Sequence, residues 1–206
     1  RHWSFIHDSL KDLRKDLKNI GQSLIVRSGS VKKIFEELSC RYNIISILSH
    51  EETGNQWTYD RDKSLQNWCL ENNISFTEFP SNGIVRRLKN RLEWSKLRNS
   101  RMKEKLVSTP TNLTPLTGIE VGVIPSKEDT TFENNYKGIV QKGGRSEVLK
   151  IMESFLSYRG KNYKYNISKP GISEQTCTRL SPHLTVQRSS PNSGVRFERT
   201  GRGQLY

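Results

Sequence analysis

Short apolar runs alternate with amphipathic segments over the first 80 residues, and this alternation limits the folds that the chain can adopt. Residues 3–20 place apolar side chains at helical spacing, and further amphipathic segments begin at Val31 and near Thr58 or Tyr59. Each is followed by a short β-branched or aromatic run, and these runs are residues 23–26, 44–48 and 76–79. Strands that alternate with helices form βαβ units. We therefore expect an α/β fold with a parallel, Rossmann-like sheet that lacks its first strand.

The composition changes three times after this region. Residues 86–106 are strongly basic and predict a long helix, and residues 107–143 are rich in proline, glycine and small polar residues. From residue 144 an amphipathic helix begins, whereas the end of the chain is a string of Ser, Arg and Gly. We expect an α/β domain (1–106), an interdomain linker (107–143), the start of a helical domain (144–185) and a disordered or non-native tail (186–206). The abrupt change at Val186 suggests a truncation or a shifted reading frame.

The charge balance points to a polyanionic partner. The chain has 34 Lys and Arg against 21 Asp and Glu, which gives a net charge of +13. A positive balance of this size is typical of proteins that bind nucleic acid, and less often of proteins that bind acidic membranes. A solvated helix face explains any single basic residue equally well. No apolar run is long enough to span a membrane, and we expect no membrane partner.

Histidine and cysteine patterns exclude some kinds of site. The four histidines show no paired spacing, so a zinc site is not expected. The three cysteines lie far apart and are odd in number, which favours a reduced, cytoplasmic location.

The stretch SHEETGNQWTYDRD, residues 49–62, places many polar side chains directly after a predicted strand. Ligands of open parallel sheets bind at this end of the strands. Glu51, Glu52, Asp60 and Asp62 are candidates to hold ribose hydroxyls or to orient Arg61. The alternative is that the two aspartates complement the helix dipole while Arg61 pairs locally.

A second polar cluster lies in YKYNISKPGISEQTCTRLSPHL, residues 163–184. Pro170 and Gly171 predict a turn, and Leu180-Ser181-Pro182 predicts the start of a helix. Small hydroxyl and thiol side chains beside Arg179 suit an anionic group such as a pyrophosphate. Ordinary helix capping explains the same residues.

These segments resemble one family. TCTRLSPHL is similar to the Ser-Arg-Leu-Ser-Pro-(aromatic or His)-Leu motif of the photolyase/cryptochrome flavoproteins. The stretch at 49–62 and GIVRRLKNRLEWSKLRNSRM resemble the α/β domain of one branch of that family. GGR and FLSYRGKNYKYNISKP resemble its entry into the helical flavin domain. The likeness runs in order over residues 1–184.

The resemblance implies a light-driven DNA repair enzyme that holds FAD in a helical domain. It implies that Tyr165, Thr178, Leu180 and Ser181 contact FAD, and it assigns no catalytic residue. Cys177 stands where relatives often have Thr. The resemblance also implies an antenna chromophore of unknown identity in the α/β domain, and a monomer that binds DNA containing pyrimidine dimers.

Three alternatives remain open at this stage. One is a cryptochrome-type photoreceptor without repair, another is a light-independent α/β nucleotide-binding module, and the third is a cofactor-free nucleic-acid-binding protein. The family continues with many more helices after the position of Leu184. We therefore expect these 206 residues alone to bind FAD weakly and to be inactive.

Overall fold

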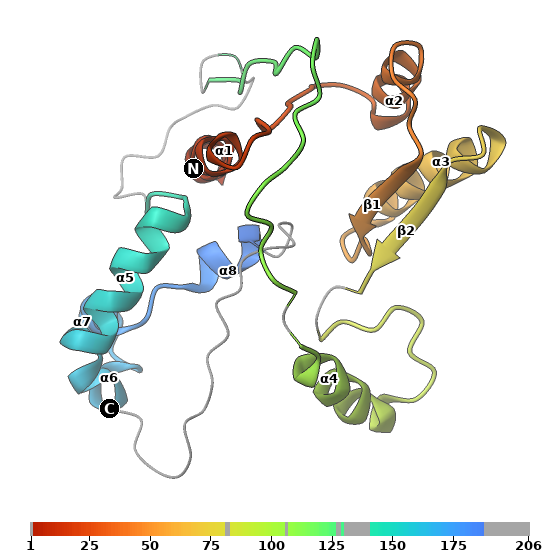
Figure 1. Ribbon diagram of the computed structural model, residues 1–206. Coiled ribbons are helices and arrows are strands. Elements are labelled where there is room, and N and C mark those ends of the chain that lie inside the picture. Colours follow the sequence, from red (N-terminus) through yellow and green to blue (C-terminus); the bar gives the residue numbers. More distant parts are fainter. Residues whose placement is uncertain (1, 81–82, 106, 127–128, 130–140, 188–206) are drawn as a thin grey trace. The chain divides into compact units, whose positions relative to one another are not determined.

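The computed structural model describes residues 2–80, 83–105, 107–126, 129 and 141–187. The chain divides into two compact units (Figure 1). We call residues 27–107 the sheet unit, and we call residues 1–26 together with 108–206 the helical unit. Each name covers the described residues only, and each unit is treated by itself.

The sheet unit contains two parallel strands with a helix between them in the chain (Figure 1). Its elements are α2 (Val31–Ser39), β1 (Ser46–His50), α3 (Gln56–Glu71), β2 (Ser75–Phe79), η1 (Arg91–Glu93) and α4 (Trp94–Lys103). Ser46 lies opposite Ser75 and His50 lies opposite Phe79. The parallel pairing with a helical connection confirms the predicted α/β fold class.

The core of the sheet unit lies between the strands and the two helices α2 and α3. Its buried side chains are Ile47, Leu65, Trp68, Cys69 and Ile74, with Val31, Phe35, Ile44 and Phe76 packed around them. The turn from α3 into β2 is fixed by Asn73, which has a left-handed φ of 56°. Asparagine tolerates this conformation better than most residues. Ile74 N then donates to the carbonyl of Cys69 (2.8 Å), which directs Ile74 into the core.

The helical unit consists of α1 and a group of helices far away in the chain. Its elements are α1 (His2–Asn19), α5 (Arg145–Ser157), η2 (Arg159–Asn162), α6 (Tyr163–Asn166), α7 (Pro170–Thr176) and α8 (Ser181–Gln187). None of the helices in the described part of the chain has the length and apolar character needed to cross a membrane.

Side chains of α1 cap the beginning of α5. Gly144 N donates to Ser9 Oγ (3.1 Å), and Ser146 N donates to Asp12 Oδ2 (2.9 Å). A side chain on Gly143 would collide with the backbone carbonyl of Phe5. The glycine pair before α5 is therefore needed for this close approach. The sequence analysis assigned α1 to the α/β domain, whereas these contacts join it to α5. The domain boundaries stay a prediction.

Two predictions about short segments, 23–26 and 170–171, differ from the structure. Residues 23–26 form no strand, although Val26 N donates to the carbonyl of Val121 (2.8 Å). A β-branched run becomes a strand only where a ladder of partners exists. Pro170 and Gly171 begin α7 instead of forming a turn, because proline fits the first position of a helix.

The predicted helix over 86–106 is shorter than expected. Arg87 has a left-handed φ of 54°, which interrupts a helix, and α4 begins only at Trp94. The side chain of Asn90 accepts from Leu92 N and starts η1 just before it. At the other end of the chain, α8 includes residues 186 and 187 of the predicted tail, and residues 188–206 lie outside the described residues.

Candidate functional site

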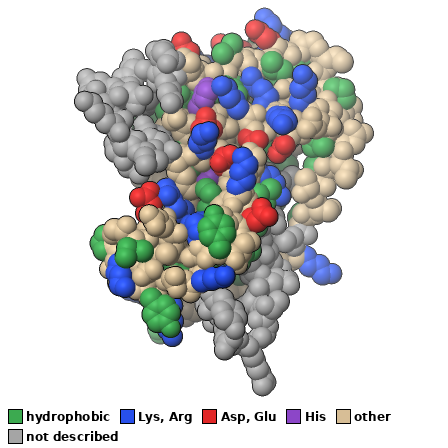
Figure 2. All heavy atoms as spheres, turned by 90° about the vertical axis from the view of Figure 1, so that its left-hand side faces the viewer, with side chains coloured by type: hydrophobic (Ala, Val, Ile, Leu, Met, Phe, Trp, Pro, Cys, Tyr) green, Lys and Arg blue, Asp and Glu red, His purple; other side chains and the backbone are tan. Residues whose placement is uncertain are grey.

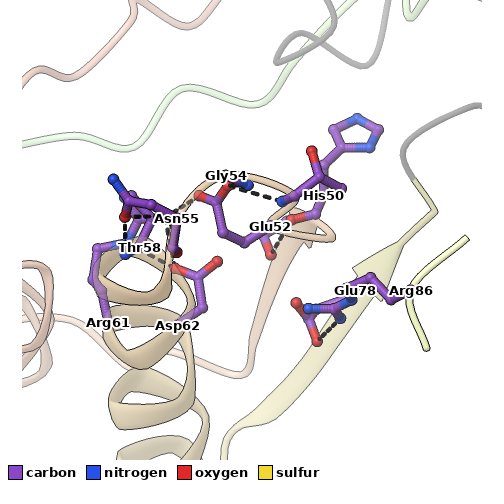
Figure 3. Close-up of polar contacts among 11 residues, drawn as sticks. His50, Glu52, Gly54, Asn55, Thr58, Arg61, Asp62, Glu78 and Arg86 are labelled. Carbon is purple, nitrogen blue, oxygen red and sulfur yellow. Dashed lines mark hydrogen bonds and ion pairs between the residues drawn. The ribbon is translucent and has the colours of Figure 1, made fainter. Parts of the chain in front are cut away.

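The loop after β1 is organised by Glu52 (Figure 3). Its Oε1 atom accepts from the backbone N–H groups of Thr53 (2.8 Å) and Gly54 (2.6 Å). Its Oε2 atom pairs with Arg61 Nη2 at 3.1 Å. Both carboxylate oxygens are therefore engaged within the loop and the first turns of α3. The position of Glu52 thus has a structural explanation without a ligand.

Two neighbouring residues explain where α3 begins. A side chain on Gly54 would place Cβ 2.8 Å from Glu52 Oε1 and 3.0 Å from Thr58 Oγ1, so only glycine leaves room for the Glu52 contacts. Asn55 Oδ1 then accepts from Thr58 N (3.0 Å) and caps the helix. The sequence analysis placed the start of α3, which is at Gln56, two or three residues too late. An Asn followed three residues later by Thr was the available signal.

The aspartates of α3 are paired locally. Arg61 Nε donates to Asp62 Oδ1 (2.7 Å), and Gln56 Nε2 donates to Asp60 Oδ1 (2.7 Å). Because α3 begins at Gln56, both aspartates lie beyond the first turn, where the helix dipole has little effect. The structure therefore supports local pairing of Arg61 and gives no support to the dipole alternative. Within the described residues, no group of three His, Cys, Asp or Glu side chains could hold a metal ion.

Arg86 connects the ends of both strands (Figure 3). Its Nη2 atom donates to Glu78 Oε2 (2.9 Å), its Nε atom lies 3.6 Å from Glu51 Oε1, and its guanidinium lies over the ring of Tyr59. Burial by itself lowers the pKa of Arg86. The hydrogen bond and charge of Glu78, together with the charge of Glu51, outweigh that effect and leave the pKa raised. These charged contacts hold the ends of both strands together.

The four residues implied to contact FAD lie in the helical unit. Tyr165 is on α6 and is 72% exposed, and Ser181 is the first residue of α8. Thr178 and Leu180 lie between α7 and α8. The Leu180 side chain is buried, at 6% exposure. The hydroxyls of Thr178 and Ser181 make no hydrogen bond to any residue that the structure describes. Their contact with FAD stays a prediction.

Arg159 is a residue that the sequence analysis did not single out. It donates to the carbonyl of Ile151 (2.9 Å), to Ser154 Oγ (2.8 Å) and to the carbonyl of Cys177 (2.7 Å). It therefore fastens the segment that carries Thr178 to the end of α5. An arginine directly after an amphipathic helix is a weak signal for such a role, because arginines often bond the last carbonyls of a helix.

Arg179 bends the chain between α7 and α8. It has a left-handed φ of 60°, its Nη1 atom pairs with Glu174 (3.0 Å), and its carbonyl accepts from Gln141 Nε2 (2.7 Å). A left-handed residue with a bulky side chain is costly, so it persists only where such contacts fix it. The bend places Leu180 inside and leaves Ser181 exposed.

His183 is a buried polar residue of the same segment. It is 1% exposed, and its ring meets that of Phe5 edge to face at 4.8 Å. Its Nε2 atom has no hydrogen-bond partner among the described residues. Burial lowers its pKa, and the charge of Glu147 opposes this only in part. The neutral ring is therefore the form that fits the folded unit.

We expect the helical unit to become less stable as the pH falls below about 6.5, the usual pKa of histidine. The unfolded chain protonates more readily than the folded one, so stability is complete above the unfolded pKa and is lost as the pH falls. His183→Phe keeps a ring against Phe5 and removes the titration. Its melting temperature should change less between about pH 7.5 and pH 5.5 than that of the parent chain. His2→Gln, at an exposed site on α1, is the control. An undiminished pH dependence in His183→Phe would contradict this account.

Comparisons with known proteins agree with the α/β fold described above. The DNA photolyase family model matches residues 1–90, which include the loop after β1. Cryptochrome DASH of Xenopus laevis is 26% identical over a match that covers 91% of this chain and 39% of that protein. A bacterial class III photolyase from Agrobacterium tumefaciens shares the fold, with a TM-score of 0.67 at 16% identity. That match covers 91% of this chain and 41% of the photolyase chain.

The chain thus spans about two fifths of the length of these relatives. The family model covers the sheet unit up to Asn90 and does not reach Tyr165 or Ser181. The comparisons do not favour a light-independent nucleotide-binding module or a cofactor-free binding protein. The family match over residues 1–90, the cryptochrome relative and the shared fold together support a relationship of this chain to the DNA photolyase/cryptochrome family.

Proposed function

We propose that the protein carrying this chain is a DNA photolyase, which uses light to split pyrimidine dimers in DNA. The observation that carries the proposal is the segment 176–184, which combines the family's motif with the hydroxyls of Thr178 and Ser181, neither of which bonds a residue that the structure describes. Members of the family generally bind FAD and act on DNA. The net charge of +13 favours a repair enzyme over a photoreceptor, because phosphate contacts dominate affinity for DNA.

The residues present fit part of a flavin site. Hydroxyl groups that have no partner among the described residues are suitable donors to a pyrophosphate, and both lie next to the bend at Arg179. Tyr165 offers an exposed ring and a phenol group. Leu180 differs from the other three, because its side chain points into the unit and only its backbone can face a ligand. Arg159 positions this segment through the carbonyl of Cys177.

FAD, when bound and reduced, supplies the light-driven electron that opens the dimer. This chain contributes binding and orientation. Thr178 and Ser181 would donate hydrogen bonds to FAD, while the buried Leu180 anchors their backbone and Arg159 limits its movement. The dimer is flipped out of the duplex by this enzyme class, so a basic protein surface must also hold the DNA backbone. We further propose a monomeric, cytoplasmic protein, which agrees with three free cysteines.

Flavin titration tests the assignment of Thr178 and Ser181. In a protein that extends through the length of its relatives, Thr178→Val with Ser181→Ala should weaken FAD binding about tenfold or more, because two hydrogen bonds to a charged group are lost. Thr176→Val is the matched control, since that hydroxyl already bonds the carbonyl of Ile172. Equal affinity of the double variant and the parent would remove both residues from the site.

The 206-residue chain by itself should bind FAD weakly. Five apolar side chains in or directly after its later helices are at least two fifths exposed: Leu149, Leu156, Ile167, Ile172 and Leu184. Tight, stoichiometric binding of FAD by the short chain would contradict this expectation.

Loss of thymine dimers under blue light, measured on the extended protein, separates photolyase from cryptochrome. A bound adenine nucleotide without a flavin spectrum would instead indicate the light-independent alternative.

A further inference from the structure

The outer face of α4 consists of basic and small polar side chains. At helical spacing, Lys96, Asn99, Ser100 and Lys103 share this face, and each of them is exposed. Neither lysine makes a hydrogen bond or an ion pair with another residue in the described part of the chain. The face therefore presents two unneutralised positive charges and two neutral hydrogen-bonding groups.

The opposite face of α4 is the one that holds the helix in place. Trp94 Nε1 donates to the carbonyl of Gly83 (2.7 Å), and Arg101 Nη1 donates to the carbonyl of Ile84 (2.6 Å). Arg98 lies over the Trp94 ring at 5.7 Å. The aromatic ring and two of the arginines are thus used to attach the helix. The outer lysines have no comparable structural task.

The charge of this region differs from that of other helices in the molecule. Residues 86–105 contain nine basic and two acidic side chains. In α2, by contrast, two lysines accompany two glutamates, and Lys32 lies 3.8 Å from Glu36. Figure 2 shows basic and acidic side chains next to one another on the face that it presents. A solvated helix normally mixes charges in that way, so a one-sided face needs another explanation.

We propose that the outer face of α4 binds the phosphate backbone of nucleic acid without regard to sequence or damage. Lysine and small polar side chains are the groups that contact phosphates and sugars. An acidic membrane fits less well. A membrane-binding helix needs a continuous apolar face. On α4 the partly exposed Trp94, Leu97 and Met102 do not form one, because Arg98 and Arg101 lie between them around the helix. The inference rests on the proposed function only for the choice of DNA as the physiological polymer.

The test measures how tightly the whole chain binds a short undamaged DNA duplex. Fluorescence anisotropy gives the binding constant at each of several salt concentrations. Lys96→Gln with Lys103→Gln should weaken binding about tenfold or more and make the slope of log K against log salt shallower by about 1.8. Lys32→Gln with Lys33→Gln removes the same charge from α2 and should change the slope little. Circular dichroism of each variant checks that the fold is retained.

The outcomes separate the inference from the proposed function. Equal losses in both double variants would show a general charge effect and overturn the inference. Tighter binding of the parent chain to phosphatidylserine vesicles or to polyglutamate than to the duplex would also overturn it. The dimer repair assay on the extended protein is independent of these results. Repair that persists after the α4 substitutions, with unchanged binding to undamaged DNA, rejects the role of α4 and leaves the photolyase proposal intact.

Discussion

Trp68→Ala should unfold the sheet unit or leave it marginally stable. Trp68 is 5% exposed and lies at the centre of the small core between β1, α2 and α3, where its ring is 6.3 Å from that of Phe35. Truncation of a buried Trp costs about 3–5 kcal/mol, and a small domain has only about 5–15 kcal/mol of net stability. Urea unfolding followed by circular dichroism measures the loss.

Trp57→Ala is the matched control for this prediction. Trp57 lies on the same helix but is 73% exposed. Its replacement should change the free energy of unfolding by no more than about 0.5 kcal/mol. Similar unfolding midpoints for the two variants would mean that the core described here does not hold the sheet unit together.

Arg159→Met should loosen the segment that leads into α8. The substitution keeps an apolar stem but removes three donated hydrogen bonds, and it leaves the carbonyls of Ile151 and Cys177 without this donor. The carbonyl of Ile151 keeps Ser154 Oγ as a donor (2.9 Å), so the cost comes from the unpaired carbonyl of Cys177 and from the lost hydrogen bonds of a charged group, about 2 kcal/mol in all. Hydrogen exchange measured by mass spectrometry should show faster exchange in residues 176–184.

Two further variants sharpen the Arg159 prediction. Arg145→Met removes an exposed arginine from the start of α5 and should leave the exchange unchanged. Arg159→Lys keeps the charge but cannot reach three acceptors from one planar group, so it should give an intermediate result. Unchanged exchange in Arg159→Met would show that Cys177 is held by other contacts.

The elements that could be predicted from the sequence are those whose own residues show a helical or strand-like apolar spacing. α1, α2, α3 and α5 follow from apolar spacing, and β1 and β2 follow from compact apolar runs ahead of a turn. The run at 23–26 has the same composition but forms no strand, because strand formation depends on a partner elsewhere in the chain. Arg87 could not be recognised as the break before α4, since arginine as a residue type gives no signal for its left-handed conformation.

In the candidate site, too, local motifs could be predicted from the sequence but distant partners could not. The loop at 49–62 and the segment at 163–184 were visible as local motifs. The partners that organise them were not. Arg86 reaches Glu51 across 35 positions, and Arg159 reaches Cys177 across 18 positions. No short spacing rule connects such pairs. The burial of His183 likewise depends on Phe5 at the other end of the chain.

The parallel pairing of β1 and β2 also sets an order of events during synthesis. Ser46 pairs with Ser75, which is 29 positions later in the chain. A ribosome that adds about 5–20 residues per second needs roughly 1.5–6 s to make that interval. Throughout this delay β1 has no partner strand, and Ile47 has neither α3 nor β2 to cover it. For seconds the nascent chain therefore exposes β1 as an unpaired, apolar strand. We expect chaperones that act near the ribosomal exit to bind it during this time.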